Sequence, residues 1–210
     1  MQIMEAGGTG MYKQCRTEQS ANRQRLLEEG LLKAMTAQHY DEISVSDLCA
    51  QMEIPRKSFY RYFSSKEGAL HALLDHALLD FESFAGPYFT GDQKRMQQDM
   101  ERVFAYWQHR KPLLDALRRS NLSGVLIQRA IEHALSESAF HRSFLPSEDR
   151  TAQEYVTMFA VCGMMSMVVQ WHHDGYPQSI HQMAQIAVRL LSRPLFPDAE
   201  SISQESPTFV

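Results

Sequence analysis

The chain has 210 residues, 44% of them hydrophobic, and a formal net charge of −4 at pH 7. That apolar content supports a buried core and excludes wholesale disorder. The three cysteines are far apart, which excludes a disulfide framework and a C-x-x-C zinc site. No apolar signal core opens the chain, so we expect a cytoplasmic protein with a flexible tail at residues 1–16.

The apolar residues recur at helical spacing, and the pattern predicts an all-α fold. The first helix is expected over residues 17–38. A second begins at Ser44, where an S-x-x-D box sets the hydroxyl against the backbone N–H of Asp47. Pro55 opens a third helix, because the missing proline N–H costs nothing at the first helical position. These three helices predict a head at residues 17–65.

A larger helical body of about six helices is expected at residues 66–193, followed by a polar tail at 194–210. A capping box, Ser64-Ser65-Lys66-Glu67, starts its first helix. The later helices are expected at 93–110, from Pro112 onward, and at 122–141, 147–172 and 178–191.

The stretch "IPRKSFYRYFSSKEGAL", residues 54–70, has four cations before its first carboxylate, Glu67. On a helical wheel, Phe59 and Phe63 share one face, and Lys57 and Arg61 lie on the opposite face. The phenylalanines are predicted core anchors. The cations are predicted to face outward, with two tyrosines at the borders between the faces.

Two short helices joined by a three-residue turn have the size and spacing of a helix-turn-helix, here at about residues 43–62. In such units the second helix enters the DNA major groove. An outward pair of cations is also typical of a plain solvated face, but the acid-free run and the capped neighbouring helices favour DNA. The candidate DNA contacts are Ser44, Pro55, Arg56, Lys57, Ser58, Tyr60, Arg61, Tyr62 and Lys66.

The stretch "SVSDLCAQMEIPRKSFYRYFSSKEGAL" resembles the helix-turn-helix of TetR-type transcriptional regulators over roughly residues 23–74. The matching positions are Ile54, Tyr60, Tyr62, Phe63, Ser65, Lys66, Glu67 and Leu70. The later stretch "CGMMSMVVQWHHDGYPQSIHQMAQI" is similar to the penultimate helix of that family and its follower. The resemblance implies a homodimeric regulator that binds a palindromic DNA operator and carries a variable ligand-binding body.

Three positions depart from the family pattern. Glu53 replaces the turn glycine, Pro55 replaces a capping serine, and Lys57 replaces the glycine nearest to DNA. A long cation at position 57 is not a passive spacer. We therefore hypothesise that Lys57 reads a base or clamps a phosphate.

Two further residue sets are expected in the body. Small residues three apart on the helix at 147–172 allow close helix approach, which together with the last helix predicts a dimer interface. Its candidates are Ala160, Gly163, Ser166, Met167, Met183 and Ala187. The candidates for a pocket that takes a small apolar or aromatic effector are Phe104, Trp107, Phe140, Phe144, Tyr155, Met158, Phe159 and Cys162.

Other interpretations explain the sequence less well. Residues 155–171 carry no charge, but polar residues interrupt them, which favours a helix buried by the core and a partner subunit over a membrane span. The nine histidines lack ligand spacing, so neither a metal nor a cofactor is expected. An enzyme and a scaffold bundle both leave the basic helix unexplained, and no catalytic motif is present. The sequence thus predicts a non-enzymatic, ligand-responsive DNA-binding regulator. It does not separate a repressor from an activator, and the resemblance implies a ligand-released repressor because repression is the commoner mode of that family.

Overall fold

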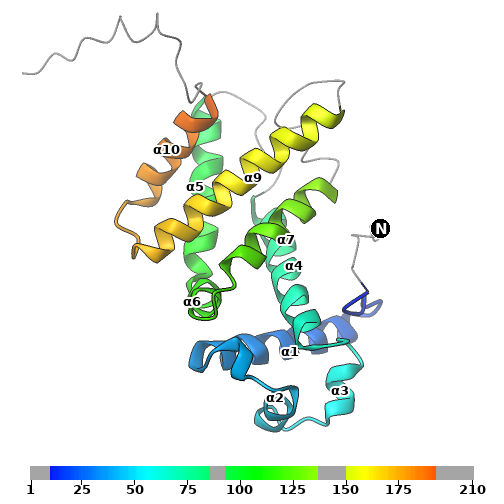
Figure 1. Ribbon diagram of the computed structural model, residues 1–210. Helices are drawn as coiled ribbons and strands as arrows, with labels where there is room; N and C mark the ends of the chain where they lie inside the picture. The colour runs from blue at the N-terminus through cyan, green and yellow to red at the C-terminus, as the bar shows by residue number, and fades with distance from the viewer. Residues whose placement is uncertain (1–9, 86–92, 137–149, 193–210) are drawn as a thin grey trace, which may run out of the picture.

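The computed structural model describes residues 10–85, 93–136 and 150–192, and within these ranges it consists of helices joined by turns and loops, with one isolated β-bridge. The all-α prediction is confirmed. Figure 1 shows a small head of three helices at one end, from which α4 runs into a larger body. The elements are α1 Glu18–Ala37, η1 Tyr40–Glu42, α2 Val45–Gln51, α3 Arg56–Tyr60, α4 Lys66–Ala85, α5 Gln93–His109, α6 Lys111–Arg119, α7 Ser123–Ser136, α9 Arg150–His173 and α10 Ile180–Ser192.

Two of the head helices begin directly after a capping side chain, and the cap at Ser44 is the predicted one. Thr17 accepts a hydrogen bond from the backbone N–H of Ser20 at the start of α1, and Ser44 accepts one from Asp47 at the start of α2. Each cap satisfies one of the free N–H groups at its helix end. The apolar faces meet in a core whose largest fully buried members are Leu31, Met35, Ile43, Leu48, Phe59 and Phe63.

Two predicted helix starts are displaced by one residue. Pro55 lies at the N-cap of α3, with ψ of 140°, instead of at its first helical position. At α4 the cap is Ser65, whose hydroxyl accepts from the N–H of Gly68, whereas Ser64 donates its hydroxyl to the carbonyl of Met11. The Ser64–Glu67 box is therefore wrong in register, because a long-range contact takes the hydroxyl of Ser64.

The body is built from packed helix pairs. α7 packs along α9, and α10 packs along α5, while α4 contacts α1, α5 and α7. α6 lies against α1 and so joins head to body. Pro112 stands in the first turn of α6, as expected. The described part of α7 ends at Ser136, and the remainder of the helix expected at 122–141 lies outside the described residues.

The apolar helix α9 has two unlike faces. Val161, Met165 and Val168 point into the body and are buried. Tyr155 and Phe159 are 68% and 69% exposed. The segment Thr151–His173 is long and apolar enough to cross a membrane by composition, a weak signal that core helices of soluble proteins also give. Its outer face is open, so the expected burial on most sides is not present in a single copy of the chain.

Candidate nucleic-acid interface and effector pocket

Helix α3 presents its cations on the face predicted by the helical wheel. Lys57 and Arg61 are exposed, while Phe59 and Phe63 are 0% and 1% exposed beneath them. The two phenylalanine rings pack against each other at an interplanar angle of 50°, with centroids 5.1 Å apart. This buried pair fixes the rotation of α3 against the head, so its cations project from a rigid support.

The turn between α2 and α3 uses a left-handed residue. Glu53 has φ of 54°, a conformation that favours glycine and costs other residues about 1–2 kcal/mol. The N–H of Ile54 then bonds back to the carbonyl of Cys49 at 2.9 Å. The turn therefore keeps the geometry of a glycine turn with a glutamate in its place.

The remaining candidates on α3 divide by exposure. Tyr60 is 47% exposed, and the guanidinium of Arg56 lies over its ring at 5.8 Å from the centroid. Pro55 is exposed and Ser58 is half-buried. Tyr62 is only 6% exposed, so its ring belongs to the core.

The two flanking candidates are already engaged within the head. The Ser44 hydroxyl donates to Asp47 at 2.6 Å and also caps α2. The Lys66 ammonium donates to the carbonyls of Tyr40 and Ile43 at 2.7 and 2.8 Å, and it lies 4.1 Å from the ring centroid of Tyr40. Burial lowers the pKa of Lys66. Its side chain thus joins the start of α4 to η1 instead of pointing outward.

Sequence reasoning missed the docking of the N-terminal segment on the head. Residues 10–16, expected as part of a flexible tail, run beside the end of α3. Lys13 donates its N–H to the carbonyl of Tyr62, and Ser64 donates its N–H to Met11. A Cβ on Gly68 would lie 2.2 Å from the carbonyl oxygen of Met11, so this close approach requires glycine. We call residues 10–16 the arm.

The arm also reaches the body through a buried ion pair. The Tyr12 hydroxyl donates to Asp75 on α4 at 2.6 Å, and Asp75 receives two hydrogen bonds from Arg129 on α7. Burial and the bond to Asp75 raise the pKa of Tyr12. Arg129 also contacts Glu132. One carboxylate therefore joins arm, α4 and α7.

Three further ion pairs fasten α4 to its neighbours. Nδ1 of His76 lies 2.9 and 2.8 Å from the two oxygens of the buried Glu28 on α1. Asp80 accepts hydrogen bonds from Arg25 on α1 and Arg110 at the end of α5. Burial alone would raise the pKa of Asp80, but the two guanidinium groups lower it. α4 is thus tied to the head on one side and the body on the other.

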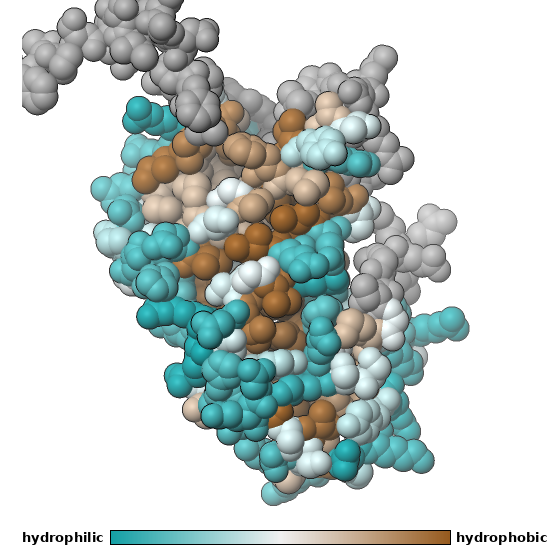
Figure 2. All heavy atoms as spheres, viewed as in Figure 1, coloured by the Kyte–Doolittle hydropathy of each residue, from teal (hydrophilic) through white to brown (hydrophobic). Residues whose placement is uncertain are grey.

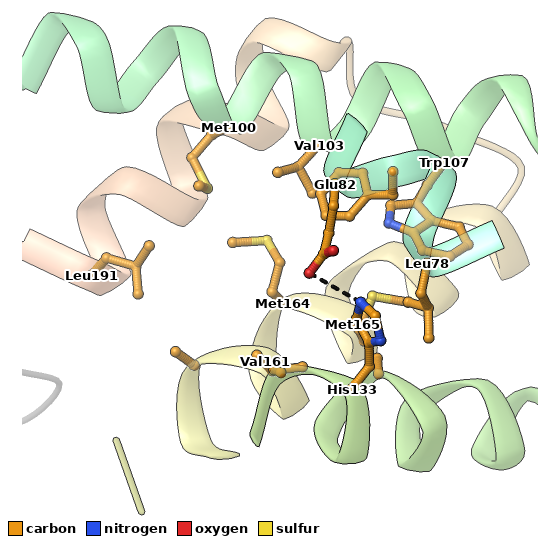
Figure 3. A pocket seen from close by; sticks show the side chains of 14 residues that line it. Leu78, Glu82, Met100, Val103, Trp107, His133, Val161, Met164, Met165 and Leu191 are labelled. Carbon is orange, nitrogen blue, oxygen red and sulfur yellow. Dashed lines mark ion pairs between the residues drawn. The ribbon is translucent and has the colours of Figure 1, made fainter. Parts of the chain in front are cut away.

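A cavity of about 70 Å³ lies in the body between α4, α5, α7 and α9, with Leu191 of α10 at one edge (Figure 3). Its lining is almost entirely apolar. The lining residues are Leu78, Phe81, Glu82, Met100, Val103, Trp107, Ala130, His133, Ala134, Ala160, Val161, Met164, Met165 and Leu191. Glu82 and His133 form an ion pair at 3.0 Å across its wall.

Of the predicted effector contacts, Trp107 lies in this wall. Phe104 is buried behind it, with its ring 5.5 Å from that of Trp171. Phe140 and Phe144 lie outside the described residues.

The predicted residues of α9 exchange faces. Tyr155, Met158, Phe159 and Cys162, expected in the pocket, are exposed on the outer face. Ala160, expected at the dimer interface, lines the cavity. The rotation of a helix is predicted from its charged and polar face, and residues 155–171 carry no charge. For this reason these positions were predicted on the wrong faces.

The other candidates for the dimer interface divide into exposed and buried residues. Gly163 and Ser166 are exposed beside Phe159, and Met167 is partly buried. Met183 and Ala187 are buried on α10, on the element that packs along α5. Within the described residues, no cluster of three or more histidine, cysteine or acidic side chains is placed to hold a metal ion.

Comparisons with known proteins bear on the head and on the fold. Residues 29–73 match the family model described as bacterial regulatory proteins, tetR family. The structure is similar to that of a tetR-family transcriptional regulator from Streptomyces coelicolor, with TM-score 0.56 and 19% identity, covering 82% of this chain and 79% of that one. It is also similar to the dihydroxyacetone kinase operon activator DhaS, with TM-score 0.52 and 16% identity, covering 81% and 94%. No curated protein matches the sequence.

Proposed function

We propose that this chain, a non-enzymatic DNA-binding transcriptional regulator of the TetR family, is a homodimeric repressor that binds a palindromic operator and is released by a small apolar effector. The observation that carries the proposal is the exposed pair Lys57 and Arg61 on α3, held by the buried Phe59 and Phe63. A cationic helix on a fixed support suits the major groove, where phosphates and guanine edges accept hydrogen bonds.

The proposed DNA contacts follow the exposure of the head residues. Arg56, Lys57, Tyr60 and Arg61 would contact DNA through their side chains, with Pro55 and Ser58 nearby. Ser44 and Lys66 are engaged internally, so we propose that they act through the backbone N–H groups at the starts of α2 and α4. Tyr62 would support the surface from below and offer at most its hydroxyl.

The proposed dimer uses the outer faces of α9 and α10. Figure 2 shows hydrophobic side chains along α9 and over α10. The exposed apolar residues there are Tyr155, Met158, Phe159, Ile186, Leu190 and Leu191. An exposed apolar surface of this kind marks an interaction site more often than free surface. Gly163 and Ser166 on the same face of α9 would let a second helix come close.

We propose that α4 carries the signal between pocket and head. Its N-terminal residue Lys66 bonds to the head, and Leu78, Phe81 and Glu82 near its other end line the cavity. A ligand that pushes on α4 would change the separation of the two α3 helices in the dimer. Such coupling requires that the ligand bind one separation more tightly than the other.

The proposal is tested with the purified chain and the DNA upstream of its own gene. We expect a complex of two chains per duplex by sedimentation, with an affinity that falls steeply with salt. A transcription assay on the same template should show less transcript when protein is added. Failure to bind any such fragment at low salt would refute DNA regulation, and increased transcription would refute repression.

A further inference from the structure

The indole N–H of Trp107 is a buried donor without an acceptor among the residues that the structure describes. Trp107 is 0% exposed and stands in the wall of the apolar cavity. A buried donor left unpaired costs about 1–3 kcal/mol, so native proteins rarely keep one without a use. The other tryptophan, Trp171, is a contrast inside the same chain, because its Nε1 donates to the carbonyl of Gln178 at 3.0 Å.

Two side chains of the cavity wall can carry charge. Nε2 of His133 lies 3.0 Å from Glu82, and the two side chains are 12% and 30% exposed. The approach lacks hydrogen-bond geometry at Nε2, and the pair is ionic when His133 is protonated. A ligand carboxylate would face Glu82, and an ionised ligand of either sign would lose its hydration against a lining that is otherwise almost entirely apolar. The wall therefore favours a ligand without net charge.

We propose that the cavity binds a small uncharged molecule with an aromatic or aliphatic body and one oxygen acceptor, such as a ketone or ester, which accepts a hydrogen bond from Trp107 Nε1. This inference rests on the proposed function, since it names the class of the effector. The apolar side chains around Trp107, among them Met100, Val103 and Met164, would enclose the body of the ligand.

The size of the cavity adds a second property. An apolar cavity of about 150 Å³ takes benzene, and this one measures about 70 Å³. A ligand that contains a phenyl ring would therefore press on the wall, which includes α4, or extend through the open side of the cavity. A five-membered ring needs less displacement, so two sizes of probe are required.

The test uses matched probes of one shape. Acetophenone, α-methylstyrene, benzoate and benzamidinium share a planar skeleton and differ in acceptor and charge. Cyclopentanone and methylenecyclopentane form the smaller pair. We expect each ketone to bind about tenfold more tightly than its hydrocarbon partner, which is the usual net gain from one hydrogen bond. Benzoate and benzamidinium should bind more weakly than acetophenone.

The hydrogen bond itself is read by NMR of the indole N–H groups in ¹⁵N-labelled protein. The Trp107 signal should move downfield with either ketone, and the Trp171 signal should stay in place because its N–H is already bonded. In Trp107→Phe the preference of ketone over hydrocarbon should disappear, and in Trp171→Phe it should persist. The NMR measurement on the unaltered chain stands even if a variant fails to fold.

Equal binding of ketone and hydrocarbon, tightest binding of a charged probe, or no binding of either ketone would each overturn the inference. Operator release is measured separately with the same probes. A ketone that binds at Trp107 without releasing DNA would leave the ligand class in place and refute the effector role. Release by a charged molecule at this cavity would support ligand control and refute the proposed class.

Discussion

Asp75 on α4 and Arg129 on α7 form a two-point buried ion pair, with Nε to Oδ1 at 2.7 Å and Nη2 to Oδ2 at 2.6 Å. The Tyr12 hydroxyl completes the coordination of the carboxylate from the arm. Ala130 and His133, beside Arg129 on α7, line the cavity. Through Asp75 and Arg129, the arm is therefore linked to α7, a helix that bounds the cavity.

Replacing the carboxylate tests what this pair contributes. Asp75→Asn leaves the buried Arg129 with only the half-exposed Glu132 as a charge partner, and removing one member of a buried pair costs about 3–5 kcal/mol. We expect a loss of that order in the free energy of unfolding measured with urea. Lys111→Ala, which breaks an exposed pair with Asp115, is the control and should cost about 0–1 kcal/mol. Equal losses in both variants would show that the buried Asp75 pair contributes no more to the free energy of unfolding than an exposed pair does.

Lys57→Gly tests whether the unusual cation on α3 contacts DNA. One lost phosphate contact should weaken operator binding and reduce the slope of log affinity against log salt by about one. The measurement is operator affinity across a salt series by fluorescence anisotropy. Lys111→Ala, in the body, should leave the slope unchanged. The hypothesis fails if affinity and slope are both unaffected at position 57.

Glu53→Gly tests the strain in the turn. The residue adopts φ of 54°, so glycine should remove a steric cost of about 1–2 kcal/mol and lose part of that gain to chain entropy. We expect a net stabilisation of about 0.5–1 kcal/mol by thermal unfolding. Glu29→Gly, at an exposed position inside α1, should instead destabilise by about 1 kcal/mol. A destabilised Glu53→Gly protein would contradict the left-handed geometry.

Phe159→Glu tests the proposed dimer face. A carboxylate at a position that is 69% exposed in one copy is tolerated by the monomer, but it would be buried unpaired between two copies. We expect the dimer to dissociate in sedimentation velocity while the helical circular dichroism is kept. The control is Leu26→Glu on α1, which changes a residue 58% exposed outside that face and should leave a dimer. The prediction is wrong if Phe159→Glu remains dimeric.

Asp80 makes stability depend on pH. Its folded pKa lies below the ordinary value of 3.8, so the charged form favours the folded state. This contribution is present above pH 3.8 and is lost as the pH falls further, through the lower folded pKa. Asp80→Asn should flatten the acid side of the stability curve measured by urea unfolding between pH 2.5 and 6. The side chain is 38% exposed, so solvent screening keeps the effect small. An unchanged acid limb would exclude the role.

The head was predictable because its signals are local. The predicted cap at Ser44 lies within three residues of the N–H group that it satisfies, and the helical wheel around Phe59 covers two turns. Contacts between distant residues were not predictable. Tyr12 and Asp75 are 63 positions apart, and Lys66 bonds back to Tyr40 across 26. The residues around each of these side chains show no pattern that predicts which distant residue it contacts.

The rotation of α9 shows the same limit inside one helix. Its uncharged run predicts a helix and a contact surface, but it offers no polar face by which the helix could be oriented. Tyr155 was therefore expected in the pocket and Ala160 at the dimer interface, whereas Tyr155 is exposed and Ala160 lines the cavity. The lining of the cavity could not be predicted, because it comes from four helices that are distant in the sequence and meet only in the folded chain.

The two faces of α9 have a consequence for how the proposed dimer would respond to effector concentration. In the proposed assembly this helix is the layer between the cavity, lined by Ala160 and Val161, and the second subunit, which would rest on Phe159 and Cys162. Adjacent residues would thus face the effector and the twofold axis. Filling one cavity would shift the surface against which the other copy packs, and the second binding event would start from an altered partner. Release from the operator would then be cooperative, with a dose response steeper than independent sites give.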